Sequence, residues 1–307
     1  MGKFFYSGII FIIGYSVLNI IFYFGITKPV LIDPYLINPK IYRQYRNFLF
    51  SDSHGAVISQ HVLDRIGIYN FAYDSDSYAD MLLKIRFLIN SNVNIDTIYL
   101  TVDNHTLSPY RESSNNLNRS IFFSNLSYLP DSIPISQSEY LLSRYVKYYV
   151  PLTDTNNSRL FYDYMKSKVI SASGKNTWEI IPEWMEIEAS LRLEKIRSRI
   201  EEQFPVKNNS EVLKNTLLEI IDIAIENKIK LVGIKFPLSG DLLSELDGMN
   251  YGADQIFRKN RISVFDFMHE FSSSEELFFD QDHLNNHGVI KFMEVLEHQI
   301  LIARKSN

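Results

Sequence analysis

Residues 46–58 read Arg-Asn-Phe-Leu-Phe-Ser-Asp-Ser-His-Gly-Ala-Val-Ile, and their pattern indicates the fold class. A short apolar run is followed by small polar residues and a glycine, and apolar residues then return. That order predicts a strand, a turn and a helix that runs to about residue 65. Further strands are expected at about 66–72, 96–103, 229–236 and 261–267, with helices at about 77–91 and 211–227. Strands that alternate with helices predict βαβ units and a parallel sheet.

The turn after the first strand contains a serine that could act as a nucleophile. Ser53 lies where free backbone N–H groups and the helix dipole favour a developing anion. A simpler interpretation is that Ser51, Asp52 or Ser53 only caps the following helix, because these residue types are favoured at that position. Capping is the more common outcome for such a segment, so a serine mechanism needs a second half elsewhere in the chain.

A motif near the C-terminus could supply that second half. Residues 280–288 read Asp-Gln-Asp-His-Leu-Asn-Asn-His-Gly, in a predicted loop that enters the last helix. The spacing lets Asp280 hold one imidazole nitrogen of His283 while the other nitrogen faces a serine. His283 could instead cap the helix or fill a turn. A metal site of His283 and His287, with Asp280 and Asp282 nearby, is a further alternative. No metal is expected, however, because the chain has no His-Glu-x-x-His arrangement and no Cys.

The Asp-Ser turn near the start and the Asp-x-x-His-Leu-Asn-x-x-Gly motif near the end together resemble the SGNH/GDSL hydrolase superfamily, over about residues 46–304. The second motif is especially similar to its membrane-anchored cell-envelope branch, which includes DltD-like and alginate O-acetyltransferase-like proteins. The resemblance implies a nucleophile at Ser53, a base at His283 and an orienting carboxylate at Asp280. We expect an α/β fold, flavodoxin-like with three α/β/α layers and a mostly parallel sheet, plus a helical insertion and one N-terminal transmembrane helix.

The same resemblance implies an oxyanion hole with three donors. In the family these are the serine N–H, a Gly N–H from a second sequence block and an Asn side chain from a third. By position they become Ser53, Ser75 and Asn104. Ala72 or Ser75 stands where a Gly is usual, and the usual Gly-x-Asn-Asp of the third block is absent. These departures also fit a degenerate, inactive member of the family. No cofactor is expected.

Residues 106–205 interrupt the alternation of strands and helices and predict a largely helical insertion over the site. The insertion is rich in aromatic residues, including Trp178 and Trp184. Aromatic side chains there could form a platform for a glycan, but packing onto the sheet or near the membrane is the more common role. Arg111 could meet an anionic substrate, although a surface ion pair is the simpler interpretation.

The N-terminal segment predicts a membrane anchor. No charged residue occurs in residues 4–27, and this length suffices to cross a bilayer. We interpret residues 1–27 as an uncleaved anchor; a cleaved signal is the alternative, but the apolar run is long and no Ala-x-Ala-like site follows. Residues 28–45, with Pro29, Pro34 and Pro39, predict an extended stalk, and residues 46–307 the domain. Basic residues flank the anchor on both sides, so charge does not orient it. The resemblance favours a single-pass protein of the cell membrane with an extracytoplasmic domain.

Composition limits the classes of function. The chain has 307 residues, of which 46% are hydrophobic and 22% charged, enough for one sizeable core. A formal net charge of −5 argues against nucleic acid as a partner. The expected function is a membrane-anchored serine esterase or O-acyltransferase that acts on a cell-envelope polysaccharide or glycan. The membrane and a membrane acyl-donor protein are the candidate partners. The alternatives are an inactive scaffold or glycan-binding component of an envelope assembly complex, and a metal-dependent hydrolase.

Overall fold

The structure, a computed structural model, describes residues 2–32, 39–124, 133, 136–147, 150, 152 and 184–305. These residues belong to two compact units. One unit contains residues 1–38, 125–128 and 135–181, and the other contains residues 39–124, 129–134 and 182–307. The second unit carries the sheet.

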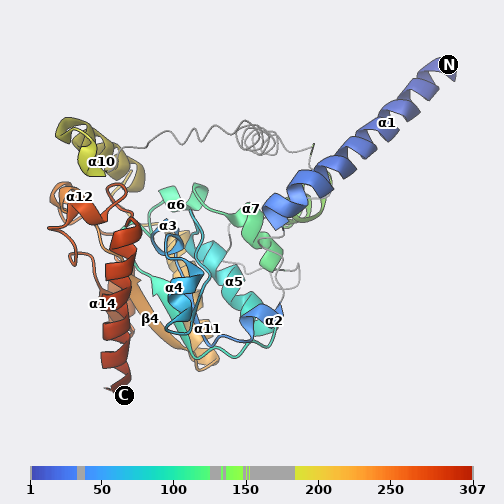
Figure 1. Cartoon of the computed structure of the whole chain (residues 1–307). Helices are drawn as coiled ribbons and strands as arrows, with labels where there is room; N and C mark the ends of the chain where they lie inside the picture. Colours follow the sequence, from blue (N-terminus) through green and yellow to red (C-terminus); the bar gives the residue numbers. More distant parts are fainter. Residues whose placement is uncertain are drawn as a thin grey trace. The chain divides into compact units, whose positions relative to one another are not determined.

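Five strands form this sheet in the order β2-β1-β3-β4-β5 (Figure 1). All four pairings are parallel. The order is that of flavodoxin-like doubly wound folds. It confirms the predicted α/β class and the parallel sheet. The strands are β1 (Asn47–Phe50), β2 (Ile68–Asn70), β3 (Thr97–Thr101), β4 (Lys230–Lys235) and β5 (Ser263–Asp266).

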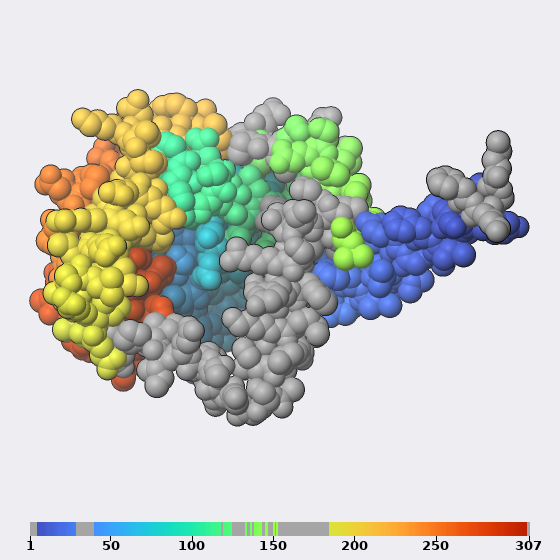
Figure 2. All heavy atoms as spheres, turned by 90° about the horizontal axis from the view of Figure 1, so that it is seen from above, coloured from blue at the N-terminus to red at the C-terminus, as the bar shows by residue number. Residues whose placement is uncertain are grey.

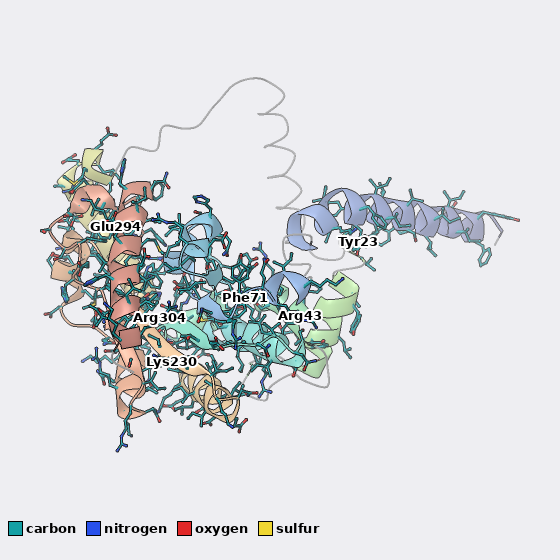
Figure 3. All side chains as sticks on the ribbon, turned by 60° about the horizontal axis from the view of Figure 1, so that its bottom comes forward. Tyr23, Arg43, Phe71, Lys230, Glu294 and Arg304 are labelled. Atoms are coloured by element: carbon teal, nitrogen blue, oxygen red, sulfur yellow. The ribbon has the colours of Figure 1, made fainter. Side chains whose placement is uncertain are left out.

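Helices cover both faces of the sheet, which confirms the three-layer arrangement (Figure 1). α5 (Tyr78–Asn90) and α11 (Glu211–Glu226) pack against each other on one face, and α14 (Asn286–Lys305) covers the other. Alternate residues of a strand point to opposite faces. Leu49 of β1 therefore joins Phe292 of α14 in one core cluster. Farther along α14, Glu294 is exposed on the outer surface of the helix (Figure 3).

An aromatic cluster packs at the β2 edge of the sheet. Phe71, labelled in Figure 3, follows β2 and contacts the rings of Tyr42, Phe50 and Phe123 at centroid distances of 5.0, 5.5 and 5.4 Å. Aromatic pairs at such distances add stabilisation beyond the area they bury. Tyr42 lies in the short helix α2 (Pro39–Tyr42), so residues just before β1 already belong to the core of the domain.

The prediction of one helix from the turn to about residue 65 is wrong. The chain forms two short helices, α3 (Ser53–Ala56) and α4 (Gln60–Asp64). Ser59 separates them because its backbone is extended, with φ −65° and ψ 146°, and it occupies the N-cap position of α4. Its side chain makes no capping hydrogen bond, so it is the extended backbone at this position that separates the two helices. Ile58, which lies between the two helices, is buried in the core.

Further short helices connect the strands. They are α6 (Tyr110–Ser113), α7 (Leu117–Ser120), η2 (Ile121–Phe123), η6 (Trp184–Glu186), α10 (Ala189–Gln203), α12 (Gly240–Leu246), α13 (Ala253–Lys259) and η7 (Glu275–Leu277). Within the predicted insertion, the described residues are indeed mostly helical. Trp184 is buried in the core, and its Nε1–H donates to Oε2 of Glu275 at 3.0 Å. This tryptophan therefore packs the fold, whereas Trp178 lies outside the described residues.

The other unit contains the predicted anchor. α1 (Gly2–Phe22) continues into a π-helical segment, η1 (Tyr23–Ile32), and residues Phe5–Lys28 are long and apolar enough to span a membrane. The predicted extended stalk differs from the structure: residues 28–32 still belong to η1 and residues 39–42 form α2, while residues 33–38 lie outside the described residues. The same unit holds α8 (Gln137–Leu141) and η4 (Leu142–Lys147).

Candidate active site

The candidate site lies at the carboxyl ends of β1 and β3. The strand order reverses direction between these two strands, and open α/β sheets bind ligands at such a point. Asp52 is the second residue after β1, and Asp103 is the second residue after β3. Figure 2 looks onto this end of the sheet and shows blue residues that follow β1 beside red residues from near the C-terminus. The two ends of the domain's sequence therefore meet here.

The loop before α14 holds Asp280 and His283 together. The Asp280 carboxylate accepts hydrogen bonds from the backbone N–H groups of Asp282 and His283, at 3.0 and 2.8 Å. It also lies 2.8 and 2.9 Å from Nδ1 of the His283 ring through its two oxygens. When Nδ1 donates a proton to Asp280, the lone pair of the neutral imidazole is on Nε2. The carboxylate thus fixes both the tautomer and the orientation of the ring.

Two further residues of the C-terminal motif explain why this loop sits where it does. Asn285 accepts the N–H of Gly288 at 3.0 Å and donates to the carbonyl oxygen of Glu276 at 2.8 Å. A Cβ at Gly288 would lie 2.2 Å from the backbone oxygen of Leu277. Only glycine therefore lets the first turn of α14 approach η7, and this close approach positions the loop that carries Asp280 and His283.

The second imidazole nitrogen of His283 is available for chemistry. Nε2 is buried and has no hydrogen-bond partner in the part of the chain that the structure describes. Burial alone would lower the pKa of His283, but hydrogen bonds to Asp280 and Asp282 raise it to about 9. The two carboxylates thus make this imidazole a stronger base than a solvent-exposed histidine.

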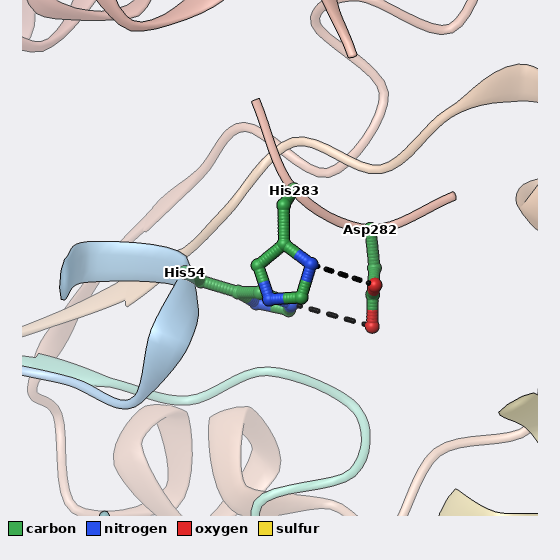
Figure 4. A group of neighbouring side chains, drawn as sticks. All are labelled: His54, Asp282 and His283. Carbon is green, nitrogen blue, oxygen red and sulfur yellow. Dashed lines mark ion pairs between the residues drawn. The ribbon is translucent and has the colours of Figure 1, made fainter. Parts of the chain in front are cut away.

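A second histidine lies against the first (Figure 4). The ring centroids of His54 and His283 are 5.3 Å apart, with an angle of 74° between the ring planes. His54 Nδ1 lies 2.7 Å from Oδ2 of Asp103, whereas its Nε2 lies 3.7 Å from Oδ2 of Asp282. The second distance is too long for a hydrogen bond, so Nε2 is buried without a partner among the described atoms. Burial would lower the pKa of His54, but Asp52 and Asp103 raise it well above its ordinary value.

Asp52 is the centre of a neighbouring buried network. Its Oδ1 accepts the N–H of His54 at 3.1 Å, and its Oδ2 lies 3.0 Å from Nε2 of His105. Burial would raise the pKa of Asp52, but His54 and His105 hold it well below its ordinary value. Arg111 is buried, lies 3.6 Å from Asp52 and donates to the backbone oxygen of Asp76. The interpretation of Arg111 as a surface ion pair is therefore wrong.

Helix α10, from the predicted insertion, reaches the site through two side chains. Arg199 Nε and Gln203 Nε2 donate to Oδ2 of Asp282, at 2.8 and 3.1 Å. Burial would raise the pKa of Asp282, but His283, His54 and Arg199 keep it well below its ordinary value. Asp282 is therefore an ionised carboxylate beside both imidazole rings.

Ser53 is the first residue of α3 and is partly exposed. The cap of α3 is Asp52, whose side chain accepts the N–H of His54, so the capping role belongs to Asp52. Ser53 adjoins His54, whose ring contacts His283. Among the described residues, Nδ1 of His283 lies close to Asp280 and Asp282, and no hydrogen bond joins the ring to Ser53.

The two other predicted oxyanion donors have different surroundings. Ser75 has a φ of 67°, the left-handed conformation that favours glycine, so its backbone adopts a shape that suits the family's Gly position. Asn104 is buried, and its Nδ2 donates to the backbone oxygen of Met249 at 2.9 Å. One donor hydrogen of the Asn104 amide is therefore directed at the loop after α12.

Sequence reasoning missed several residues of the site. They share one signal, a polar residue in a segment that directly follows a buried strand: His54, Asp103 and His105. Asp282 was predicted only as part of the metal alternative. Arg199 and Gln203 carried no signal of this kind, because they lie on a charged helix whose placement depends on the fold. The strand-end signal was applied to Ser53 and Asn104 instead of to their buried neighbours.

Two groups in the described residues could hold a metal ion. One consists of His54, Asp282 and His283, and the other of Asp52, His54 and Asp103. His287, which the metal alternative paired with His283, is exposed on α14 and belongs to neither group. The first group thus keeps His283 and Asp282 from the metal alternative and has His54 in place of His287.

Comparisons with known proteins give no evidence on the function. No protein-family model matches the chain. No curated protein matches its sequence.

Proposed function

We propose that this protein is an SGNH-like serine esterase or O-acyltransferase. The observation that carries the proposal is the Asp280–His283 pair: a carboxylate 2.8 Å from Nδ1, and a buried Nε2 without a partner among the described residues. This is the arrangement of a general base whose second nitrogen takes a proton from a nucleophile. Ser53 is the nucleophile in the proposal, because it adjoins His54 and the His54 ring lies against His283.

In the proposed reaction, Oγ of Ser53 attacks the carbonyl carbon of an acyl ester while its proton passes to Nε2 of His283. The ester's alcohol leaves with that proton, and the acyl group remains on Ser53. An acceptor hydroxyl then attacks the acyl-enzyme, and its proton passes to Nε2 of His283. The bond between the acyl group and Oγ of Ser53 breaks, and His283 returns the proton to that Oγ. If the acceptor is a sugar hydroxyl, the reaction is O-acyl transfer; if it is water, the reaction is hydrolysis.

The proposed setting is the cell membrane. Residues Phe5–Lys28 are apolar enough to anchor the chain, and the resemblance to the envelope branch supports an extracytoplasmic domain. A cell-envelope polysaccharide or glycan is the proposed acceptor or substrate, and a membrane protein could deliver the acyl group.

The experiment is labelling of the detergent-solubilised full chain with a fluorophosphonate probe, in EDTA, read by intact mass. Wild type is expected to gain one probe per chain, and Ser53→Ala and His283→Ala to gain none. Ser59→Ala is the matched control, because Ser59 is exposed and its side chain caps nothing in α4. Equal labelling of wild type and Ser53→Ala would contradict the proposal.

A second candidate is a non-catalytic scaffold or glycan-binding component of an envelope assembly complex. It is supported by the absence of a hydrogen bond between Ser53 and His283 in the described residues, and by the donation from Asn104 to Met249. A well-folded wild type that takes no probe, even after extended incubation, would favour this scaffold.

A further inference from the structure

The contact of His54 with His283 brings together three side chains that suit a metal ion. One nitrogen from each ring and one carboxylate oxygen of Asp282 all lie within 4.8 Å of one another (Figure 4). We propose that these three side chains bind a divalent transition-metal ion, with Zn²⁺ as the probe. The proposal does not rest on the serine mechanism, since Ser53 takes no part in it.

Two buried nitrogens without partners support this site. Nε2 of His54 and Nε2 of His283 are both enclosed and have no hydrogen bond in the described part of the chain. The His54 side chain is only 2% exposed. A buried polar atom without a partner costs free energy, and such atoms often mark a water, an ion or a ligand. Coordination by a metal would satisfy both.

Carboxylates already hold the opposite nitrogen of each ring. Asp103 lies 2.7 Å from Nδ1 of His54, and Asp280 lies 2.8 Å from Nδ1 of His283. Metal-binding histidines usually donate their other N–H to a carboxylate, which fixes the tautomer and turns the free lone pair to the metal. In the third ligand, Asp282, Oδ2 accepts from Arg199 Nε at 2.8 Å and lies 3.7 Å from Nε2 of His54, while Oδ1 lies 3.1 Å from Nδ1 of His283.

The donor set indicates which metals fit. Two imidazoles and one carboxylate suit Zn²⁺ and related transition metals, whereas Mg²⁺ and Ca²⁺ prefer oxygen ligands. Zinc–ligand bonds of about 2.0–2.1 Å place tetrahedral ligand atoms about 3.3 Å apart. His54 Nε2 and Asp282 Oδ2 are 3.7 Å apart, so only a small contraction is required. The partly exposed side chain of His283, at 17%, gives the ion access.

The test is calorimetric titration of Zn²⁺ into the full-length, detergent-solubilised chain without a polyhistidine tag, after EDTA treatment and transfer to metal-free buffer. Wild type is expected to bind one ion per chain, and Mg²⁺ is expected not to compete. His54→Ala and His283→Ala are expected to weaken binding more than about 100-fold. His287→Ala is the matched control, because His287 is exposed on the first turn of α14, four residues after His283, and it should bind like wild type.

Asp103→Asn separates metal binding from a folding defect. It keeps the shape of the side chain but removes the carboxylate that orients His54, so the affinity for Zn²⁺ should fall about 10- to 100-fold in a chain with an unchanged circular dichroism spectrum. The proposal is overturned if wild type binds no Zn²⁺, if binding survives in His283→Ala, or if Mg²⁺ binds as tightly as Zn²⁺. None of these outcomes depends on the fluorophosphonate result, which is obtained in EDTA.

Discussion

His283 lies between two carboxylates, and its environment determines the pH at which it can act as a base. Hydrogen bonds with Asp280 and Asp282 outweigh the effect of burial and raise its pKa to about 9. A general base must be neutral to accept a proton. The proposed serine chemistry should therefore accelerate as the pH rises, and should level off only above this pKa.

Replacement of Asp280 tests this dependence. In EDTA, the rate of fluorophosphonate labelling of wild type should rise with pH up to about 9. In Asp280→Asn, the pKa of His283 falls because a charged partner is lost, so the profile should shift to lower pH. The maximal rate should fall by up to about 10⁴-fold, since the imidazole loses its fixed tautomer. An unchanged profile would show that Asp280 does not orient the base.

Sequence alone could pair Asp280 with His283 because they are three residues apart in one loop. It could not identify the contacts of His54 with Asp103 and Asp282. Those contacts depend on the register of β1 and β3 and on the position of the last loop, which no local pattern specifies. The pattern after β3 drew attention to Asn104, although its neighbour Asp103 accepts the backbone N–H of Phe236 and contacts His54.

Helix α14 depends on one glycine for its distance from η7. A Cβ at Gly288 would lie 2.2 Å from the oxygen of Leu277 and 2.9 Å from the side chain of Leu284. Gly288→Ala should therefore destabilise the domain by about 1–3 kcal/mol, as overpacking does, and reduce fluorophosphonate labelling. Thermal unfolding followed by circular dichroism measures the first effect. His287→Ala, one residue earlier and exposed, should unfold like wild type; equal melting of the two variants would refute the steric argument.

Helix α5 is tied to the loop after β2 by a buried ion pair. Lys84 contacts Asp76 and donates to the backbone oxygen of Phe71 at 3.0 Å. Burial raises the pKa of Asp76 to about 7, although Lys84 opposes the shift. Lys84→Met leaves that carboxyl group without its cation and should lower the free energy of unfolding by about 3–5 kcal/mol.

The control for this change is Lys214→Met, which removes a surface pair with Glu211 and should cost less than about 1 kcal/mol. Denaturant unfolding of both variants gives the comparison. If Lys84→Met is no less stable than Lys214→Met, the buried pair contributes nothing to holding this loop.

Elements were predictable where apolar runs are long. The strands and α5 and α11 lie within a few residues of their predicted bounds, because their apolar residues follow one regular spacing. The break between α3 and α4 was not predictable, since Ser59 fits the polar face of a continuous helix as well as a cap. The helical start of the predicted stalk was not predictable either. Pro29 disfavours a regular α-helix, and the chain there is π-helical.

For the whole molecule, the strand order is the feature that places the site. β1 and β3 are neighbours, while β2 and β4 lie on their outer sides, so the loops after β1 and β3 lie side by side and contact each other through His54 and Asp103. The alternation of strands and helices predicted a parallel sheet but not which strands are adjacent. That order depends on packing between segments far apart in sequence.

Membrane attachment and orientation are testable together because the chain has no Cys. The full chain should sediment with membranes and resist alkaline extraction, since Phe5–Lys28 is apolar and long. A single cysteine introduced as Ser59→Cys, at an exposed position, should react with a membrane-impermeant maleimide in intact cells if the domain is extracytoplasmic. Reaction only after lysis would place the domain in the cytoplasm.

The site joins Asp52 to His54 with Asp280 to His283, which a ribosome adds much later. A chain that is still being synthesised therefore has the serine and lacks the base, whatever local structure it has formed. Contacts between distant parts of a sequence also form late in folding. Under the proposed function, reactivity toward a serine probe would thus appear only after Asp280 to His283 have been added and the sheet has assembled, and a chain truncated before them would not react with the probe. A pulse of probe during synthesis would then report the moment at which the domain finishes folding.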